Sequence, residues 1–163
     1  MRTLLLLRHA KSSWKEPALA DYERPLSRRG RRDAPRMGAL LVEMGLEPEW
    51  ICCSSAKRAR QTAEAVMDAC RYDGEIEYRE DLYHAGLGDF LEAIRDLPAD
   101  CTRVLLIGHN PGLEELLDWL TDESEWLPTA ALAQIELNLD AWQDLLPETQ
   151  GRLRGLWRPK ELI

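Results

Sequence analysis

The 163-residue sequence has no long hydrophobic run and no stretch typical of a secretory leader. Its apolar runs are short, such as the four leucines at residues 4–7, whereas a helix needs about 20 apolar residues to cross a membrane. The first residues, Met1-Arg2-Thr3, lack the hydrophobic region of a signal peptide. We therefore expect no membrane association and a location in the cytoplasm.

A cysteine motif is also absent, because the four cysteines form neither a C-x-x-C pair nor a zinc-binding spacing. Cys52 and Cys53 are adjacent on a predicted strand, so their side chains should point to opposite faces of a sheet. We interpret these two residues, with Cys70 and Cys101, mainly as small buried side chains in a reducing compartment.

Positive charge is in the minority, because 21 Lys and Arg face 29 Asp and Glu, for a net charge of -8. Such a balance argues against a nucleic-acid partner, since binding to phosphate backbones depends on basic residues. Residues 24–36 are a local exception, with one acidic residue, Asp33, and six arginines: Arg24, Arg28, Arg29, Arg31, Arg32 and Arg36. This segment is either a solvated helix face or a surface that attracts an acidic phosphoprotein.

What the chain does contain is an alternation of predicted strands and helices, without internal repeats or a linker. Strands are predicted at residues 3–7, 50–53, 75–78, 103–107, 132–139 and 153–157. Predicted helices end at Gly45, run from a cap at Ser55 through Cys70, and begin at Asp89 and Pro111; Ser27 or Asp33 would cap the first. Residues 10–26 are predicted to be a loop. The pattern predicts a single domain over residues 1–163 with an α/β fold, a three-layer α/β/α sandwich around a mostly parallel central sheet.

Three of the predicted strands are followed by residues that can bind or attack a phosphoryl group. Arg8 and His9 end the first strand, Arg58 lies in the first turn of the helix after the second, and His109 follows the strand at 103–107. Parallel strands deliver their carboxyl ends to a common crevice, so these side chains should meet there. Arginine offers a planar fork of donors to phosphate oxygens, and a neutral histidine has a free nitrogen for attack. Each residue alone has an ordinary structural explanation, but the set predicts phosphoryl chemistry.

The residues that carry this pattern also resemble a known family. The segment Arg8-His9-Ala10-Lys11-Ser12-Ser13-Trp14 resembles the R-H-G signature of the histidine phosphatase superfamily, which has a phosphoglycerate mutase-like fold. Residues 54–63 resemble its second motif, and Gly108-His109 resembles its late histidine. Further segments, at residues 24–27 with Gly30, 33–38, 81–83 and 107–117, are similar to the SixA-type phosphohistidine phosphatases.

This resemblance implies a reaction without a metal ion or other cofactor. His9 would attack phosphorus and become phosphohistidine, while Arg8, Arg58 and His109 would hold the phosphoryl oxygens. Water would then hydrolyse the intermediate. The implied substrate is a protein that carries phosphohistidine, and the alternative substrate is a small phosphomonoester.

The chain departs from the family pattern at two positions. Ala10 replaces the usual glycine after the histidine, and His84, in the segment Leu82-Tyr83-His84-Ala85, falls where many relatives carry a glutamate acid. The acid would then be His84, Asp81 or Glu80, or no residue at all. An alkoxide leaving group needs a proton donor, whereas the nitrogen of a phosphoramidate is easier to protonate. A weakened acid position therefore favours phosphohistidine as the substrate.

Three further residues are candidates for contact with substrate. Ser12 and Lys15 lie in the loop after His9, and Lys15 falls where related mutases carry an asparagine near phosphate. Arg24 belongs to one of the motifs similar to SixA. Each of the three is otherwise explained as an ordinary loop side chain.

Three other hypotheses compete with this one. Cys52 and Arg58 have the C-x5-R spacing of cysteine-dependent phosphatases, although no glycine lies between them. The chain could also be a phosphate-binding module without catalysis. A zinc site made of His9, His84 and His109 is opposed by the neighbouring arginines, which would repel a dication.

Overall fold

Six strands form one sheet in the computed structural model, which describes residues 1–162, and their order is β3-β2-β4-β1-β5-β6. The bounds are β1 Arg2–Arg8, β2 Trp50–Ser54, β3 Ile76–Arg79, β4 Arg103–Gly108, β5 Leu132–Leu137 and β6 Gly151–Trp157. The pairs β1–β4, β2–β4 and β2–β3 are parallel, and β5 is antiparallel to both of its neighbours. Only β5 thus runs against the others, which confirms the mostly parallel sheet.

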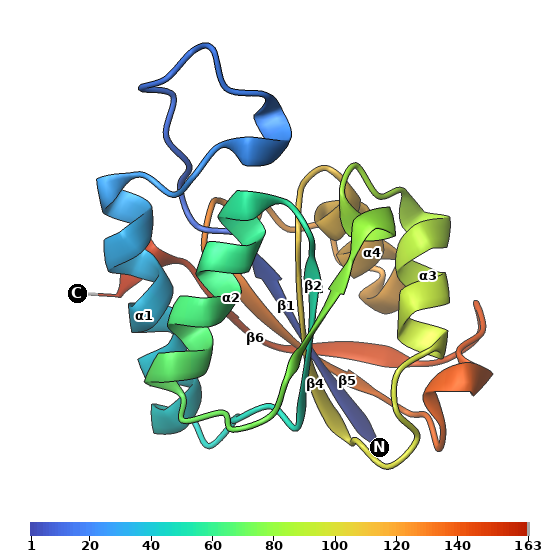
Figure 1. Ribbon diagram of the computed structural model, residues 1–163. Coiled ribbons are helices and arrows are strands. Elements are labelled where there is room, and N and C mark those ends of the chain that lie inside the picture. The colour runs from blue at the N-terminus through green and yellow to red at the C-terminus, as the bar shows by residue number, and fades with distance from the viewer. Residues whose placement is uncertain (163) are drawn as a thin grey trace.

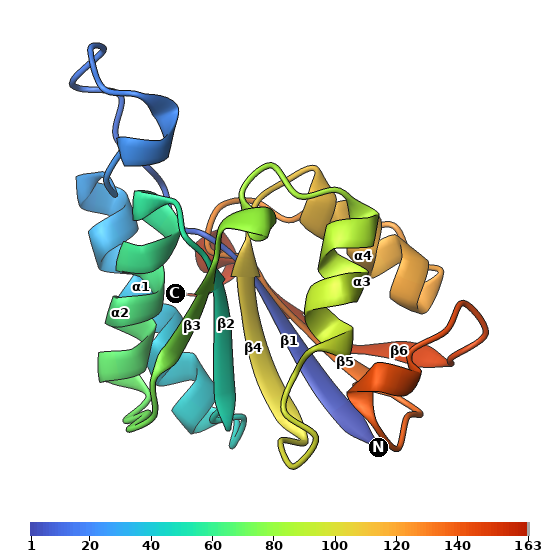
Figure 2. The same ribbon diagram turned by 45° about the vertical axis from the view of Figure 1, so that its right-hand side comes forward.

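Helices cover both faces of this sheet. Figure 2 shows α1 (Arg28–Glu43) and α2 (Lys57–Ala69) on one side and α3 (Leu87–Arg95) and α4 (Gly112–Thr121) on the other. The leucines of β1 are fully buried and alternate between the two cores: Leu5 and Leu7 face the α1 and α2 side, whereas Leu4 and Leu6 face the α3 and α4 side. The predicted three-layer α/β/α sandwich is therefore confirmed.

The order of the strands places one crevice at the carboxyl ends of β1 and β4. The chain leaves β1 for β2 through α1 on one face, and it leaves β4 for β5 through α4 on the other (Figure 1). Two neighbouring strands whose connections diverge in this way leave a gap above their carboxyl ends, where ligands bind in open α/β sheets. In the register of these strands Arg8 is opposite Gly108, so the next residues, His9 and His109, flank this gap.

The structure confirms two of the helix ends predicted from the sequence and contradicts the prediction at three positions. Ser27 caps α1 by accepting a hydrogen bond from the Gly30 amide at 3.1 Å, and Gly45 follows the helix with a φ of 67°, as its role of stop signal predicts. The alternative cap, Asp33, is wrong because it lies buried inside α1. The cap at Ser55 is wrong as well, because the backbone becomes helical only after Ala56.

The third correction concerns the start of α3. The helix begins at Leu87, two residues before the predicted Asp89. The Asp89 carboxylate reaches back and accepts a hydrogen bond from the Gly86 amide at 3.0 Å. Asp89 therefore caps the start of the helix from inside its first turn, which is the usual position of the acidic residue in a capping box.

Residues 10–26 rise above the carboxyl ends of the strands as an irregular excursion, as Figure 1 shows in dark blue. The excursion contains a short 3₁₀ helix, Asp21–Glu23, and is closed at its base by a bridge between Ser12 and Leu26. The predicted loop thus arches beside the crevice and can place side chains over it. Among residues 1–162, no helix is both long and apolar enough to cross a membrane.

Candidate active site

A cavity of about 580 Å³ opens at the carboxyl ends of β1 and β4. The structure brings together here the four residues that the sequence predicts for phosphoryl chemistry: Arg8, His9, Arg58 and His109. His84, Ser12 and Arg24, which were also singled out from the sequence, lie in the wall of the same cavity. Lys15 is exposed on the excursion and is not among the residues that line it.

His9 is held in a single tautomer by its backbone. Its Nδ1 lies 2.8 Å from the carbonyl oxygen of Ala10, and because a carbonyl only accepts, Nδ1 carries the hydrogen. The other nitrogen, Nε2, then has a free lone pair. Burial lowers the pKa of His9 to about 3, with His109, Arg58 and Arg8 adding to the shift, so the ring is neutral at physiological pH. A buried neutral imidazole with a free Nε2 is suited to nucleophilic attack.

His109 lies beside this ring, with 4.9 Å between the two ring centroids. Its Nε2 makes a 2.8 Å hydrogen bond with the hydroxyl of Ser54, whereas its Nδ1 is buried without a partner among residues 1–162. Burial and the nearby Arg58 lower the pKa of His109 to about 3. When Ser54 donates to Nε2, the hydrogen of the neutral ring resides on Nδ1 and makes this nitrogen a donor.

The two arginines differ in how they are held. Arg8 donates from Nη1 to the carbonyl oxygen of Leu127 at 3.1 Å, and burial lowers the pKa of its guanidinium. Arg58 is only 7% exposed and uses both Nη atoms to bind Asp21: Nη1 donates to the backbone carbonyl at 2.8 Å and Nη2 to the carboxylate at 3.1 Å. Because an arginine carries five N–H donors, each side chain keeps further donors for an anion in the cavity.

Asp21 connects the excursion to the rest of the site, and sequence reasoning missed it. Its carboxylate accepts hydrogen bonds from the Tyr83 hydroxyl at 2.6 Å, from Arg24 at 2.9 Å and from Arg58. The Tyr83 hydrogen bond and the two guanidinium groups hold the pKa of Asp21 well below its usual range. The signal available in the sequence was weak, because Asp21 lies in a loop without periodicity, 37 residues from Arg58 and 62 from Tyr83.

Arg24 is buried below this network and supports the wall of the cavity. It donates to the Ser12 hydroxyl and to the Ser13 carbonyl, and its guanidinium lies 3.2 Å from the centroid of the Trp14 ring. The donors of Arg24 are thus largely engaged in holding the excursion together. This geometry favours a positioning role for Arg24 and Ser12.

The candidates for the acid occupy different places. His84 lines the cavity, is exposed, and stacks on Tyr83 with 3.9 Å between ring centroids. Asp81 instead accepts two hydrogen bonds from Arg79, at 2.8 and 2.9 Å, and neither Asp81 nor Glu80 lines the cavity. Of the three, His84 alone is positioned to meet a ligand.

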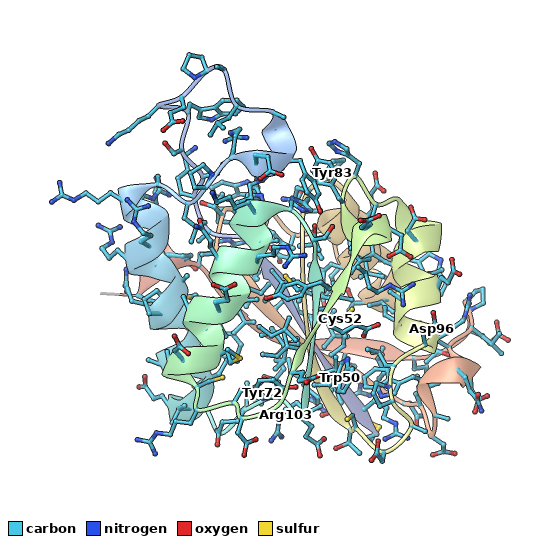
Figure 3. The ribbon with its side chains drawn as sticks, viewed as in Figure 1. Trp50, Cys52, Tyr72, Tyr83, Asp96 and Arg103 are labelled. Atoms are coloured by element: carbon cyan, nitrogen blue, oxygen red, sulfur yellow. The ribbon has the colours of Figure 1, made fainter. Side chains whose placement is uncertain are left out.

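The cysteine hypothesis receives no support from the geometry. Cys52 is fully buried in the core that β2 shares with α3 and α4, and burial raises the pKa of its thiol, which disfavours the thiolate. Figure 3 shows Cys52 partway down the sheet, whereas Tyr83 lies at the upper end near the excursion. Cys53 belongs to the opposite core, as the alternation of a strand predicts.

The zinc hypothesis needs three ligating side chains in one place. Within the part of the chain that the structure describes, no group of three or more His, Cys, Asp or Glu side chains is arranged to hold a metal ion. His9, His84 and His109 therefore do not form such a group.

Comparison with known proteins agrees with this geometry. A family model described as the histidine phosphatase superfamily (branch 1) matches residues 4–100. An uncharacterized chloroplastic protein of Arabidopsis thaliana is 30% identical over 99% of this chain and 80% of its own length. An uncharacterized protein of Mycobacterium tuberculosis is 34% identical over 86% of this chain and 92% of its own. A solved structure from Nakamurella multipartitia, a candidate phosphohistidine phosphatase SixA, superposes with a TM-score of 0.86 at 28% identity and covers 97% of this chain and 96% of that one.

Proposed function

Because this chain belongs to the histidine phosphatase superfamily, we propose that it removes the phosphoryl group from a protein phosphohistidine through a covalent intermediate on His9. The chain is a phosphatase hydrolase of this superfamily, and the proposal concerns its substrate and the roles of its residues. The six strands of residues 1–162 lie in one sheet, which supports the prediction that residues 1–163 act as one phosphatase domain. Location in the cytoplasm stays a prediction.

In this proposal His9 forms and releases the phosphoryl bond. Its Nε2 attacks phosphorus in line, the bond to the leaving group breaks, and the phosphoryl group passes to His9. Donors of Arg8, Arg58 and His109 bind the phosphoryl oxygens and stabilise the charge of the transition state. Water then attacks the same phosphorus atom and returns His9 to its neutral form.

The observation that favours phosphohistidine is the ionisation and solvent exposure of the carboxylates that line the cavity. Asp21 and Glu115 are the carboxylates that line it. Asp21 is kept ionised by Tyr83, Arg24 and Arg58, and Glu115 is exposed to solvent on α4. Neither is a buried acid ready to protonate an alkoxide, so the site suits a nitrogen leaving group that needs little help. The SixA-type structure with which the chain superposes supports the same substrate.

A small phosphomonoester is the second candidate substrate. The observation that favours it is the position of His84, which lines the cavity and could donate a proton to a leaving oxygen. The two candidates differ in how much they need this residue.

The test is steady-state hydrolysis of a phosphohistidine-containing protein, p-nitrophenyl phosphate and an alkyl phosphate by the same preparation. We expect a clear preference for phosphohistidine, and His9→Ala should lower turnover of every substrate by about a thousandfold or more. Cys52→Ser is the matched control and should retain activity. Fast hydrolysis of the alkyl phosphate would contradict the proposal and assign the acid role to His84.

A further inference from the structure

A second depression, half of whose lining residues are basic, opens beside the catalytic cavity. It has a volume of about 340 Å³ and shares Arg8, Lys11 and Thr129 with the cavity, so the two adjoin each other. Its remaining wall comes from the start of α1, the segment before β5 and the end of the described chain. We call this depression the basic groove, defined by Lys11, Arg29, Trp126, Arg158, Lys160 and Glu161.

Three of its cations remain available for a ligand. Arg158 is paired with Glu125 at 3.2 Å and with Glu161 at 3.8 Å. Within residues 1–162, Lys11 and Lys160 make no ion pair, and the contact of Arg29 with Asp33 is long, at 3.7 Å. The carboxylate of Asp33 is moreover shared with two other arginines of α1. The groove therefore presents uncompensated positive charge on a chain whose net charge is -8.

Acidic side chains line the surface next to the groove and the cavity. Glu115 lines the cavity itself, and a neighbouring depression on α4 is lined by Glu114, Glu115, Asp118 and Glu125. This acidic depression shares Trp126 with the basic groove, so a large charged partner that covers both meets cations and carboxylates in a fixed arrangement. Such a field favours one orientation of a large charged partner.

Two exposed tryptophans extend this surface beyond the size of a small phosphate ester. Trp126 lines the basic groove and is 63% exposed, and Trp14 lines the catalytic cavity and is 69% exposed. Tryptophan and arginine are the residues that most often carry the binding energy of protein interfaces. A macromolecule bound over the cavity and the groove would cover both rings.

We propose that the basic groove docks acidic side chains that flank the phosphohistidine of a protein substrate, so that the enzyme selects phosphohistidines in acidic segments. This proposal rests on the proposed function, since it names which phosphohistidine proteins the site accepts. The charge complementarity of Lys11, Arg29 and Lys160 identifies the partner as acidic. Because groove and cavity adjoin at Arg8, Lys11 and Thr129, one segment can place its phosphohistidine beside His9 and its carboxylates in the groove.

The probes are two synthetic peptides that carry one phosphohistidine and differ only in the flanking residues, which are Asp and Glu in one and Asn and Gln in the other. We expect the acidic peptide to have a kcat/KM about tenfold higher, mainly through a lower KM, and we expect this ratio to fall as salt is added.

Charge-reversal variants connect this preference to the groove. In the double variant Arg29→Glu and Lys160→Glu, the ratio between the two peptides should fall to one or below. Arg28→Glu is the matched control, because Arg28 is an exposed arginine of the same helix that lies outside both the groove and the cavity, and it should retain the preference. Thermal unfolding checks that all variants are folded, and Lys160→Glu alone, in an exposed position, supplies a milder test.

The outcomes separate this proposal from the one on which it rests. Equal hydrolysis of both peptides would overturn the docking proposal and leave the phosphohistidine phosphatase activity standing. Failure to hydrolyse either peptide, with rapid hydrolysis of p-nitrophenyl phosphate, would overturn the proposed function as well. Preference for a small bisphosphate that is lost in Lys160→Glu would assign the groove to a second phosphate of a small substrate and overturn the protein partner.

Discussion

Two buried histidine rings, His9 and His109, lie against a cluster of arginines, and burial makes protonation of both unfavourable. The pKa of each is lowered to about 3, from an ordinary value of 6.5. In the unfolded chain both rings regain a pKa near this ordinary value. Below about pH 6.5 the unfolded state therefore binds more protons than the folded state, and protonation favours unfolding.

This difference predicts how stability depends on pH. The contribution of each neutral histidine to the free energy of unfolding is fully present above pH 6.5 and is lost as the pH falls toward 3. Between pH 7 and pH 5, the free energy of unfolding should therefore fall by about 2 kcal/mol for each histidine. Urea denaturation at the two pH values measures this loss, and in His9→Gln the loss should be smaller by about that amount. A wild-type protein that is equally stable at pH 7 and pH 5 would contradict the assignment of buried, neutral rings.

Asp21 is the residue that fixes Arg58, and its removal should weaken catalysis without touching the nucleophile. In Asp21→Asn the charged partner of Arg58, Arg24 and Tyr83 is lost, so we expect kcat/KM to fall by about tenfold because the guanidinium is no longer held in place. Glu23→Gln, in the same 3₁₀ helix, is the control, since the Glu23 carboxylate makes no ion pair within residues 1–162. Restored activity in Asp21→Glu would support positioning. A kcat/KM that rises in Asp21→Asn would instead mean that the carboxylate competes with phosphate for Arg58.

Asp21 could not be predicted from the sequence, whereas three other residues of the site could. Arg8, His9 and His109 were predictable because each follows a strand whose apolar run is visible, and strand ends of a parallel sheet converge. Asp21 and Tyr83 lie in irregular segments, and their partnership depends on how the excursion folds back over the cavity. No local periodicity encodes such a contact.

At the scale of elements, the start of α1 is packed against the loop that follows β1, and Gly30 makes this possible. A β-carbon on Gly30 would lie 2.1 Å from the carbonyl oxygen of Lys11, which is backbone and cannot move aside without shifting the segment after His9. The hydroxyl of Ser27 also donates to the same carbonyl, at 3.1 Å. The excursion is thereby closed at its base next to the nucleophile.

We expect Gly30→Ala to destabilise the protein by about 1–3 kcal/mol and to lower activity, because the clash displaces the segment that carries His9. Gly88→Ala is the matched control: Gly88 lies in α3, a β-carbon added to it would meet no atom within 4 Å, and alanine favours helix. Gly88→Ala should be as stable as the wild-type protein or slightly more stable. Thermal unfolding together with phosphatase assays measures both effects. Equal stability of the two variants would contradict the close approach of Gly30 to the carbonyl oxygen of Lys11.

Elements were predictable where the pattern of buried residues is strong and less so at their ends. The buried leucines of β1 and the apolar stripe of α4 identify their elements without ambiguity. The start of α2 was misplaced because Ser55 is a good cap by residue type, yet its hydroxyl is buried and makes no hydrogen bond among the described residues. Residue type states a preference for a cap, whereas backbone conformation, set by packing, decides where the helix begins.

At the scale of the whole molecule, the site depends on an uneven distribution of charge. The chain is acidic overall, yet arginines and lysines gather where α1, the excursion and the end of the chain meet beside the cavity. The arginines of residues 24–36 divide accordingly: Arg24 is buried in the wall of the cavity, and Arg29 reaches the basic groove. Composition predicted the positive segment, and only the fold places part of it next to the nucleophile.

The covalent role of His9 is tested most directly by trapping the enzyme during turnover of a phosphohistidine protein, by rapid quenching followed by mass spectrometry of its peptides. A covalent intermediate on His9 predicts one phosphoryl group on the peptide that contains this residue, which appears before free phosphate and is absent in His9→Ala. A phosphoryl group on another residue, or release of phosphate with no labelled enzyme at any time, would contradict the covalent role of His9.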